Sequence, residues 1–467
     1  MQSVLLIDVV GLTSRQIGPR TPTLAALGAS GARAPMDAVL PAVTCSAQAT
    51  MLTGRMPTVH GAVGNGWFDR DSGEVGLWRQ SNSLVQSRKL YELAHERDST
   101  FTCAKLFWWW NMGAAVDWSI TPRPFYPSDG RKIVAVYGHP PSFAADLELD
   151  LDPFPFFDFW GPKSGLPSSR WIADATLRTL EKHRPTLTLA YLPHLDYTHQ
   201  RYGPDDPRSL DALGEVDLLV HDLWKAAERL GIATVVVSEY GIERVDRPIH
   251  INRALRRAGL LEVRPTPAGE ALDTFASTAF AVSDHQVAHV YARTQEARAH
   301  AAHVLRNLEG VAEVLDRSAQ RKYGLDHARS GDLVVVAKRG GWFTYYYWLD
   351  DALAPDFART VDIHRKPGYD PCELFLDPAL KLPKLRVAAR LAQKALGMRY
   401  LMDVIPLDAG LVRGSHGRLP DDPLDGPVFL ASKPFDLVGG EPMRGVVPMT
   451  SVCERVLELI FGRGEAQ

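Results

Sequence analysis

SVLLIDVV at residues 3–10 is a short, continuous apolar run with one acidic residue near its end. Runs of the same kind recur later, at TLTLAYL (186–192), ATVVVSEY (233–240), AHVYA (288–292) and DLVVVAK (332–338). A continuous run rich in β-branched residues is typical of a strand that is buried on both faces, as in a parallel sheet between helices. The repeated pattern therefore predicts a mostly parallel central sheet.

The stretches between these runs carry apolar residues at helical spacing, in WIADATLRTLEKH (171–183), SLDALGEVDLLVHDLWKAAERLG (209–231) and HINRALRRAGLL (250–261). Helices alternating with buried strands predict an α/β fold with helices on both faces of the sheet. We expect one catalytic domain over residues 1–467. Two segments interrupt the alternation, at about 107–168 and 342–412, and are expected to form insertions that make a lid or cap on the substrate side.

The composition excludes several classes of protein. The chain has 467 residues, of which 45% are hydrophobic and 23% charged, as in folded globular proteins. Its formal net charge of −3 argues against a nucleic-acid polymer as partner. No early basic, apolar leader and no spanning-length apolar run is apparent, so no membrane partner is expected. Four scattered cysteines without a CxxC pair suggest free thiols and a cytoplasmic protein.

Acidic residues stand at the ends of three apolar runs. Asp8, Asp196 and Glu239 all follow or end such runs. In open α/β sheets the active residues gather just beyond the carboxyl ends of the strands. These three side chains are therefore the first candidates for a site.

The segment PAVTCSAQATMLTGRMPTVHGAVGN (41–65) carries the most specific signal. It follows the strand that ends near Asp8, and further along come Asp196 with YGP close behind, SEYG (238–241) and RGSHG (413–417). In this order the motifs resemble the alkaline phosphatase superfamily, and within it the type I phosphodiesterase and nucleotide pyrophosphatase family. The resemblance extends from Asp8 to His416, nearly the whole chain.

The resemblance implies a metal-dependent hydrolase of phosphodiester or pyrophosphate bonds in a small phosphorylated metabolite or nucleotide derivative. Thr44 would be the nucleophile that forms a phospho-threonine intermediate, and Asn65 would donate a hydrogen bond to a phosphoryl oxygen. A helix N-terminus at Thr44 would favour the incoming phosphate. The simpler interpretation of Thr44 is an N-cap, the commonest role of threonine before a helix.

The resemblance also implies a pair of divalent cations, expected to be zinc with manganese as the alternative. Asp8, Thr44 and Glu239 would bind on one side, and Asp196 and His416 on the other, with His199 as a further ligand. Gln200 stands where the family has a histidine, with His199 one residue earlier, and Tyr240 replaces a second histidine. The possible substitute ligands or substrate contacts are Gln200, Tyr240, His250, His285 and His364.

Three alternatives remain open at this point. The same scaffold suits a phosphomonoesterase or a phosphonoacetate-type hydrolase. The missing histidines suit a non-catalytic relic that binds a phosphorylated ligand. The aromatic runs at 107–110 and 342–348 could stack a flat substrate group or simply pack in the interior.

Overall fold

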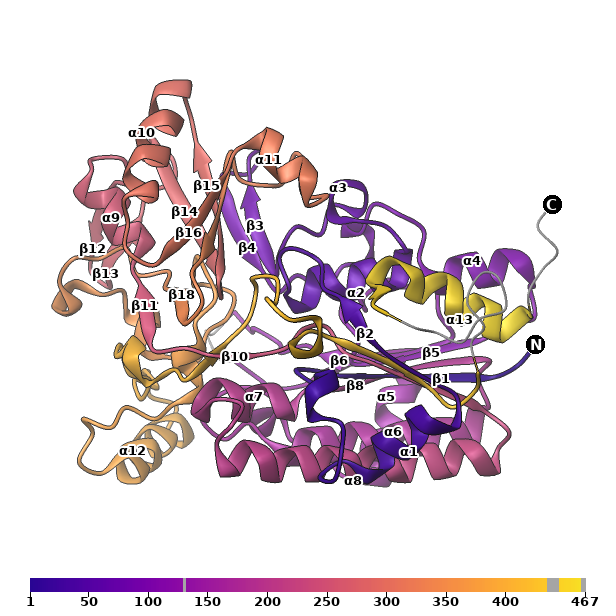
Figure 1. Ribbon diagram of the computed structural model, residues 1–467. Helices are drawn as coiled ribbons and strands as arrows, with labels where there is room; N and C mark the ends of the chain where they lie inside the picture. Colours follow the sequence, from indigo (N-terminus) through magenta and orange to yellow (C-terminus); the bar gives the residue numbers. More distant parts are fainter. Residues whose placement is uncertain (129–131, 435–444, 463–467) are drawn as a thin grey trace.

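The computed structural model describes residues 1–128, 132–434 and 445–462. Its centre is a nine-stranded sheet, mostly parallel, in the order β21-β2-β20-β9-β1-β8-β5-β6-β7 (Figure 1). The strands are β1 (Val4–Val9), β2 (Ala32–Asp37), β5 (Cys103–Leu106), β6 (Trp118–Pro122), β7 (Val136–His139), β8 (Leu187–Leu192), β9 (Ala233–Val237), β20 (Val428–Ala431) and β21 (Val447–Pro448). The predicted α/β fold with a mostly parallel central sheet is confirmed.

Helices cover both faces of this sheet. One face carries α1 (Pro22–Ser30), α5 (Pro141–Leu151), α6 (Leu166–His183) and α8 (Pro207–Arg229), and the other carries α2 (Thr44–Thr53), α4 (Leu90–Arg97) and α13 (Val452–Phe461) (Figure 1). The middle strand β1 is fully buried and pairs in parallel with β8 and β9. Burial on both faces accounts for the unbroken apolar runs in these strands.

Two predicted strands belong to a different sheet. β15 (Val287–Ala292) and β17 (Leu333–Ala337) pair antiparallel, and with β14 (Ala279–Asp284) and β16 (Val311–Leu315) they form a four-stranded antiparallel sheet. Helices α9 (Ile251–Arg257) and α10 (Gln295–Arg306) pack against it, while Val287 and Val334 join a buried cluster that contains Trp109 and Trp110. Because both faces are covered, these antiparallel strands show the same continuous apolar pattern as buried parallel strands, and the expectation that they belong to the parallel central sheet is wrong.

The two predicted insertions contain regular elements. Residues 107–168 include β6 and β7, which extend the central sheet, and α5; residues 129–131 lie outside the described part. Residues 342–412 include α12 (Pro383–Ala395) and all but the first residue of β18 (Gly341–Phe343). The lid or cap role of both segments, and the single domain, stay predictions.

The remaining elements are short. The described helices also include α3 (Pro57–His60), α7 (His194–Tyr202) and α11 (Arg317–Lys322). Two-stranded pairs are formed by β3 (Gly66–Asp69) with β4 (Glu74–Leu77), β10 (Glu243–Arg244) with β19 (Gly414–Ser415), β11 (Arg247–Ile249) with β18, and β12 (Val263–Thr266) with β13 (Gly269–Leu272).

The interior holds most of the aromatic side chains singled out in the sequence. Trp108, Trp109 and Trp110 are buried, as are the tyrosines of the run at 342–348. Packing is therefore their structural role. All four cysteines are buried free thiols. Among the described residues, no helix is both long and apolar enough to cross a membrane.

Lys105 in β5 gives a stability prediction. Its ammonium is fully buried and donates a hydrogen bond to the Trp110 carbonyl (2.8 Å). Burial lowers the pKa of Lys105 from its ordinary 10.5 to about 7. Between those values the unfolded chain binds more protons than the folded chain, so this group makes stability rise with pH from about 7 towards about 10.

We expect Lys105→Met to flatten that pH dependence. Thermal denaturation of the wild type and the variant at about pH 7 and about pH 10 measures this pH dependence. The other titrating groups are common to both proteins, so the difference between them reports Lys105. A difference in melting temperature that does not change across the window would contradict the assignment.

Candidate active site

The predicted acidic residues meet at the carboxyl edge of the central sheet. Asp8 lies near the end of β1, in register with Tyr191 of β8 and Val237 of β9. Glu239 comes two residues after β9 ends, and Asp196 lies in the first turn of α7, just after β8. Both are buried, as is Asp8. Parallel pairing places these strand ends side by side, as expected for such sheets.

Thr44 is the first residue of α2, and its N-cap is Val43. The N-cap interpretation of Thr44 is therefore wrong. Its hydroxyl donates a hydrogen bond to Glu239 Oε2 (2.8 Å) instead of bonding to the helix backbone, and the residue is 3% exposed. A hydroxyl held by a carboxylate at a helix N-terminus has the arrangement of an activated nucleophile.

Gln48, one turn after Thr44 on α2, was not foreseen from the sequence. Its Nε2 donates to Glu239 Oε1 (2.7 Å) and to Asp8 Oδ2 (3.2 Å). Its Oε1 accepts the backbone N–H of Trp109 (2.6 Å), which fixes the orientation of the amide. The amide nitrogen thus lies between the two carboxylates. The spacing of four from Thr44, which places both on one helix face, was the available signal.

Asp196 is held by neutral donors. Gln200 Nε2 donates to Asp196 Oδ2 (2.6 Å), and the Tyr369 hydroxyl donates to Gln200 Oε1 (3.0 Å). The Tyr240 hydroxyl donates to Asp196 Oδ1 (3.3 Å) and lies 3.3 Å from Thr44 Oγ1. The two residues that replace family histidines therefore act as hydrogen-bond donors around the Asp196 carboxylate.

His416 faces the same carboxylate. Its Nδ1 lies 2.7 Å from the carbonyl oxygen of Ala42, so Nδ1 carries the proton and Nε2 has a free lone pair. Nε2 lies 3.8 Å from Asp196 Oδ1 and has no hydrogen-bond partner among the described residues. The ring stacks on Tyr240 (3.5 Å between ring centroids) and contacts His285 (3.7 Å), which in turn stacks on Tyr369.

Asn65 lies beside the nucleophile and is positioned by a second acid. Its Oδ1 accepts the backbone N–H of Cys45 (3.0 Å), next to Thr44. Its Nδ2 and its backbone N–H both donate to the buried Asp284 carboxylate, at 3.0 and 2.7 Å. Asp284 was also not foreseen, because it is 219 residues away in the sequence. One Nδ2 hydrogen stays available for a phosphoryl oxygen.

Three histidines named from the sequence have other partners. His199 Nε2 lies 3.5 Å from the amide of Gln16, His250 Nδ1 lies 2.8 Å from the Thr344 hydroxyl, and His364 Nδ1 lies 3.3 Å from the Leu77 carbonyl. Of the possible substitutes, the structure brings Gln200, Tyr240 and His285 to the cluster around Asp196 and His416.

Burial controls the electrostatics of the cluster. It raises the pKa of Glu239 to about 7 and that of Asp196 to about 7, and it raises the pKa of Asp8, which also faces the Glu239 charge. Burial lowers the pKa of His416 well below its ordinary value, so the ring is neutral. Among the described residues no lysine or arginine forms an ion pair with these three carboxylates.

These donors suit one divalent cation better than two. On the Asp196 side, a neutral imidazole with an unpartnered Nε2 faces a carboxylate oxygen, a pair that zinc or manganese accepts. On the Asp8 side, the amide nitrogen of Gln48 already lies between the carboxylates. The described residues contain no group of three or more His, Cys, Asp or Glu side chains that could hold a metal ion. The two-cation centre implied by the resemblance stays a prediction, and the Gln48 amide is the feature on the Asp8 side that argues against a second cation.

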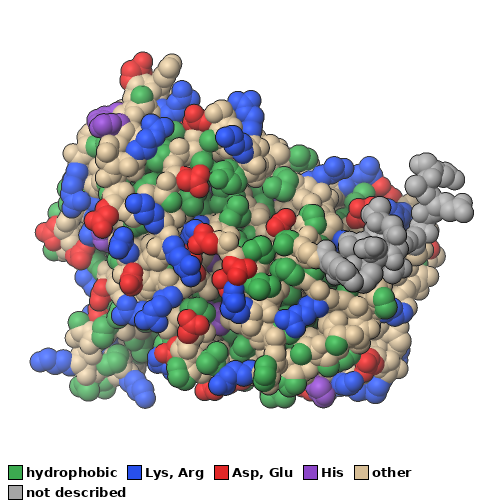
Figure 2. Space-filling view, viewed as in Figure 1, with side chains coloured by type: hydrophobic (Ala, Val, Ile, Leu, Met, Phe, Trp, Pro, Cys, Tyr) green, Lys and Arg blue, Asp and Glu red, His purple; other side chains and the backbone are tan. Residues whose placement is uncertain are grey.

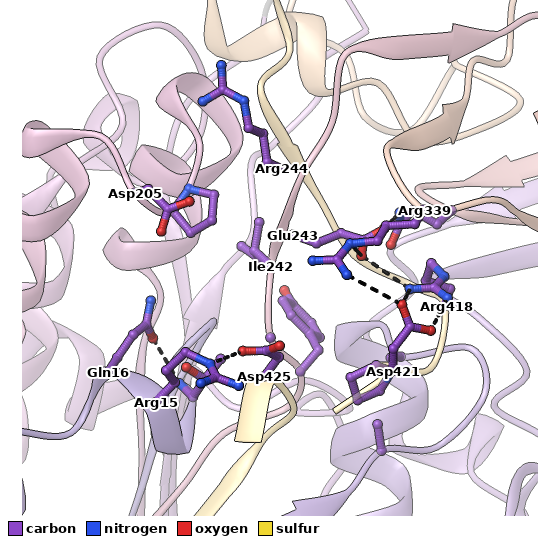
Figure 3. Close-up of a pocket in the computed structure, with 18 residues that line it drawn as sticks. Arg15, Gln16, Asp205, Ile242, Glu243, Arg244, Arg339, Arg418, Asp421 and Asp425 are labelled. Carbon is purple, nitrogen blue, oxygen red and sulfur yellow. Dashed lines mark hydrogen bonds and ion pairs between the residues drawn. The ribbon is translucent and has the colours of Figure 1, made fainter. Parts of the chain in front are cut away.

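A cavity of about 340 Å³ adjoins the cluster at the same edge of the sheet. Tyr240 belongs both to its wall and to the polar cluster around Thr44. Four arginines line this cavity. Arg15 pairs with Asp425, and Arg244 extends separately (Figure 3). Arg418 and Arg339 lie near the acids Glu243 and Asp421.

Comparison with known families decides the membership of the chain. The family described as type I phosphodiesterase/nucleotide pyrophosphatase matches residues 4–370, which include Thr44, Asn65, Asp196 and Glu239. The chain belongs to this family. His416 lies beyond the matched region, and its place in the site comes from the structure. Members of this family are, by its description, hydrolases of phosphodiester and pyrophosphate bonds.

Individual relatives are more distant. An uncharacterized pyrophosphatase/phosphodiesterase of Schizosaccharomyces pombe is 26% identical over 221 residues, which are 45% of this chain and 38% of the relative. The match thus spans well under half of that protein.

Solved structures confirm the fold over 98% of the chain. Phosphonoacetate hydrolase from Sinorhizobium meliloti 1021, in complex with phosphonoformate, has a TM-score of 0.61 at 14% identity, covering 98% of this chain and 96% of that one. An inactive form of murine ectonucleotide pyrophosphatase/phosphodiesterase 5, in complex with AMP, has a TM-score of 0.59 at 15% identity, covering 98% and 95%. At such identities the likeness concerns the fold alone.

Proposed function

We propose that this chain hydrolyses a phosphodiester or pyrophosphate bond in a small phosphorylated molecule, with Thr44 as the nucleophile. The observation that carries the proposal is the hydrogen bond from Thr44 Oγ1 to Glu239 Oε2 (2.8 Å) at the first residue of α2. It joins a nucleophile, a proton acceptor and a helix N-terminus in one place.

In the first step the proton of Thr44 passes to Glu239 while Oγ1 forms a bond to phosphorus. The bond from phosphorus to the leaving oxygen breaks, and that oxygen takes a proton from solvent. In the second step water forms a new bond to phosphorus and releases a proton to solvent. The bond between phosphorus and Oγ1 then breaks, and Oγ1 recovers its proton from Glu239.

The surrounding residues orient the reacting group. Asn65 is proposed to donate its free Nδ2 hydrogen to a phosphoryl oxygen, which is most useful when charge builds up in the transition state. Asp196 and His416 are proposed to hold one divalent cation, zinc or manganese. When bound, that cation would neutralise negative charge on the leaving oxygen.

The cavity beside Tyr240 is proposed to hold the rest of the substrate. Its volume of about 340 Å³ suits a small molecule. Arginines and acids in its wall favour a ligand with several polar groups. Tyr240 then forms the boundary between this part of the substrate and the group that reacts at Thr44.

Asn65→Ala is expected to lower kcat by roughly 10²- to 10³-fold, the usual effect of removing one donor to a developing oxyanion. Asp284→Asn is expected to act through Asn65 and to lower kcat less, with little change in KM. Steady-state kinetics on bis-p-nitrophenyl phosphate measures both. Equal kcat in wild type and Asn65→Ala would remove Asn65 from the site.

The bond that is cleaved is tested with a panel of substrates. Bis-p-nitrophenyl phosphate, p-nitrophenyl phosphate and phosphonoacetate report phosphodiesterase, phosphomonoesterase and carbon–phosphorus cleavage respectively. We expect the diester to react fastest. A preference for the monoester or for phosphonoacetate would move the chain to the corresponding alternative on the same scaffold.

One observation favours a second candidate, a protein that binds a phosphorylated ligand without turnover. Thr44 is 3% exposed, and neutral donors bond to the acids around it. This candidate predicts no hydrolysis of any compound in the panel and unchanged ligand binding after Thr44→Ala.

A further inference from the structure

The segment at residues 381–401 concentrates positive charge. It contains Lys381, Lys384, Arg386, Arg390, Lys394 and Arg399, and no acidic residue occurs between 378 and 402. Without these six cations the chain has 46 basic against 55 acidic residues, a formal charge of −9. The net charge of −3 over the whole sequence therefore conceals a strongly basic segment in an acidic protein.

Helix α12, within this segment, is fixed to the protein along one side. Val387 packs against the second hydrophobic core, which includes the aromatic run at 342–348. Arg390 pairs with Asp403 (3.0 Å), and Arg386 binds the same carboxylate. These contacts determine which face of the helix points outward.

The outward face is apolar. We define the outer face of α12 as Leu385, Ala388, Ala389, Ala392 and Leu396, which follow one another at helical spacing and are all exposed. Leu385 is 63% and Leu396 76% exposed, and Leu382 and Met398 extend the apolar surface beyond the helix ends. The helix forms a corner of the molecule, remote from the central sheet (Figure 1).

Lys384, one residue before Leu385, borders this face, whereas Lys394 lies seven residues after Val387 and so on the side of the helix that Val387 occupies. Among the described residues none forms an ion pair with Lys384 or Lys394, in contrast to the paired Arg386 and Arg390. Figure 2 shows hydrophobic side chains between Lys and Arg side chains at the same corner. An apolar face with basic borders on one helix is the pattern of a segment that lies in the plane of a membrane surface.

The geometry points to α12 as a docking element for an anionic lipid bilayer. Its leucines enter the interface between head groups and acyl chains, while Lys384 at the border contacts anionic head groups and Lys394 adds to the positive potential near the surface. The opposite charge of such a bilayer matches the local excess of positive charge, which remains when the Asp403 carboxylate bound by Arg386 and Arg390 is counted. The expectation of no membrane partner rested on the lack of a leader and of a spanning-length apolar run, and neither criterion detects a helix that lies on the membrane surface.

A bilayer suits the shape of this surface better than a protein groove. A groove encloses a helix on several sides, whereas α12 has one free apolar face, flanked by charges and backed by the protein. The outer face is also flat, because three of its five residues are alanine. A planar partner can contact the whole face at once.

The test is co-sedimentation of the full chain with vesicles. We expect binding to vesicles of phosphatidylcholine mixed with phosphatidylglycerol, weak binding to phosphatidylcholine alone, and release when salt rises from about 0.1 M to about 1 M. Leu385→Glu combined with Leu396→Glu should lower the bound fraction at least about tenfold, as should Lys384→Glu combined with Lys394→Glu.

The matched control is Leu218→Glu combined with Leu149→Glu. These leucines lie on α8 and α5, are 61% and 85% exposed, and bring the same change in charge. The control should bind vesicles about tenfold better than the α12 variants. The proposal would be overturned if the Leu218/Leu149 control lost as much vesicle binding as the α12 variants. Equal binding of the wild type to both lipid compositions would also overturn it.

Light scattering without lipid tests whether a second copy of the chain, rather than a bilayer, covers the outer face of α12. If the wild type is a dimer that Leu385→Glu with Leu396→Glu converts to monomers, the outer face of α12 is an interface between copies and the membrane proposal is wrong. Hydrolysis of soluble substrates should be the same in all of these variants, so the outcome is independent of the proposed active site.

Discussion

Thr44→Ala is expected to abolish hydrolysis, lowering kcat by about 10⁴-fold or more, because the variant lacks the hydroxyl that is proposed to form the bond to phosphorus. Thr44 Oγ1 holds the hydrogen bond to Glu239 Oε2, and removal of the hydroxyl leaves the carboxylate with no nucleophile to deprotonate. Thr44→Ser should restore a large part of the activity, since it returns the hydroxyl. Turnover of bis-p-nitrophenyl phosphate by the three proteins measures the effect.

Thr50→Ala is the matched control for that variant. Thr50 lies on the same helix, is buried, and bonds to the Ser46 carbonyl (2.8 Å) and His60 (3.0 Å). Its loss should reduce stability and leave kcat nearly unchanged. If Thr44→Ala kept wild-type turnover, or if Thr50→Ala lost as much, the nucleophile would not be Thr44.

The second large effect concerns metal content. We expect about one equivalent of zinc or manganese per chain, held by Asp196 and His416, and we expect chelation to remove activity. His416→Ala should lose the cation, because it removes the unpartnered Nε2 that lies 3.8 Å from Asp196 Oδ1. Elemental mass spectrometry on the purified proteins measures the content directly, without an activity assay.

His289→Ala serves as the control for this measurement. His289 is equally buried, but its two ring nitrogens already bond to the Val63 carbonyl (2.9 Å) and the Gly331 N–H (3.0 Å). It should keep the wild-type metal content. A protein free of metal, even after zinc or manganese is supplied, would exclude Asp196 and His416 as ligands.

Gln48→Ala tests why one metal ion per chain is expected rather than two. Removing the amide leaves Asp8 and Glu239 facing each other without the donor between them, so the variant should take up a second cation. Two equivalents in the wild type would show that the Gln48 amide does not exclude a cation from this place. The metal content of the variant and the wild type under identical loading decides between the two results.

Local sequence was sufficient for many features. The apolar runs located β1, β8 and β9, because a buried strand must be apolar along its length. Acidic residues at the strand ends were expected to gather at one edge, and the family resemblance placed Thr44 with them; Thr44 and Glu239 do meet, although 195 residues separate them. Parallel strands bring their carboxyl ends to one edge whatever the length of the connections.

The path of the chain in space decided the rest. Periodicity reports how buried a strand is, not which strand is its neighbour, so β15 and β17 gave no sign of their antiparallel sheet. His416 faces Asp196 while His199, three residues from Asp196, lies beside Gln16. Gln48 and Asp284 became part of the site because their hydrogen-bonding partners are brought to them by distant segments. Sequence determined which side chains can do chemistry, and tertiary packing determined which of them share a partner, because hydrogen bonds depend on distance in space rather than along the chain.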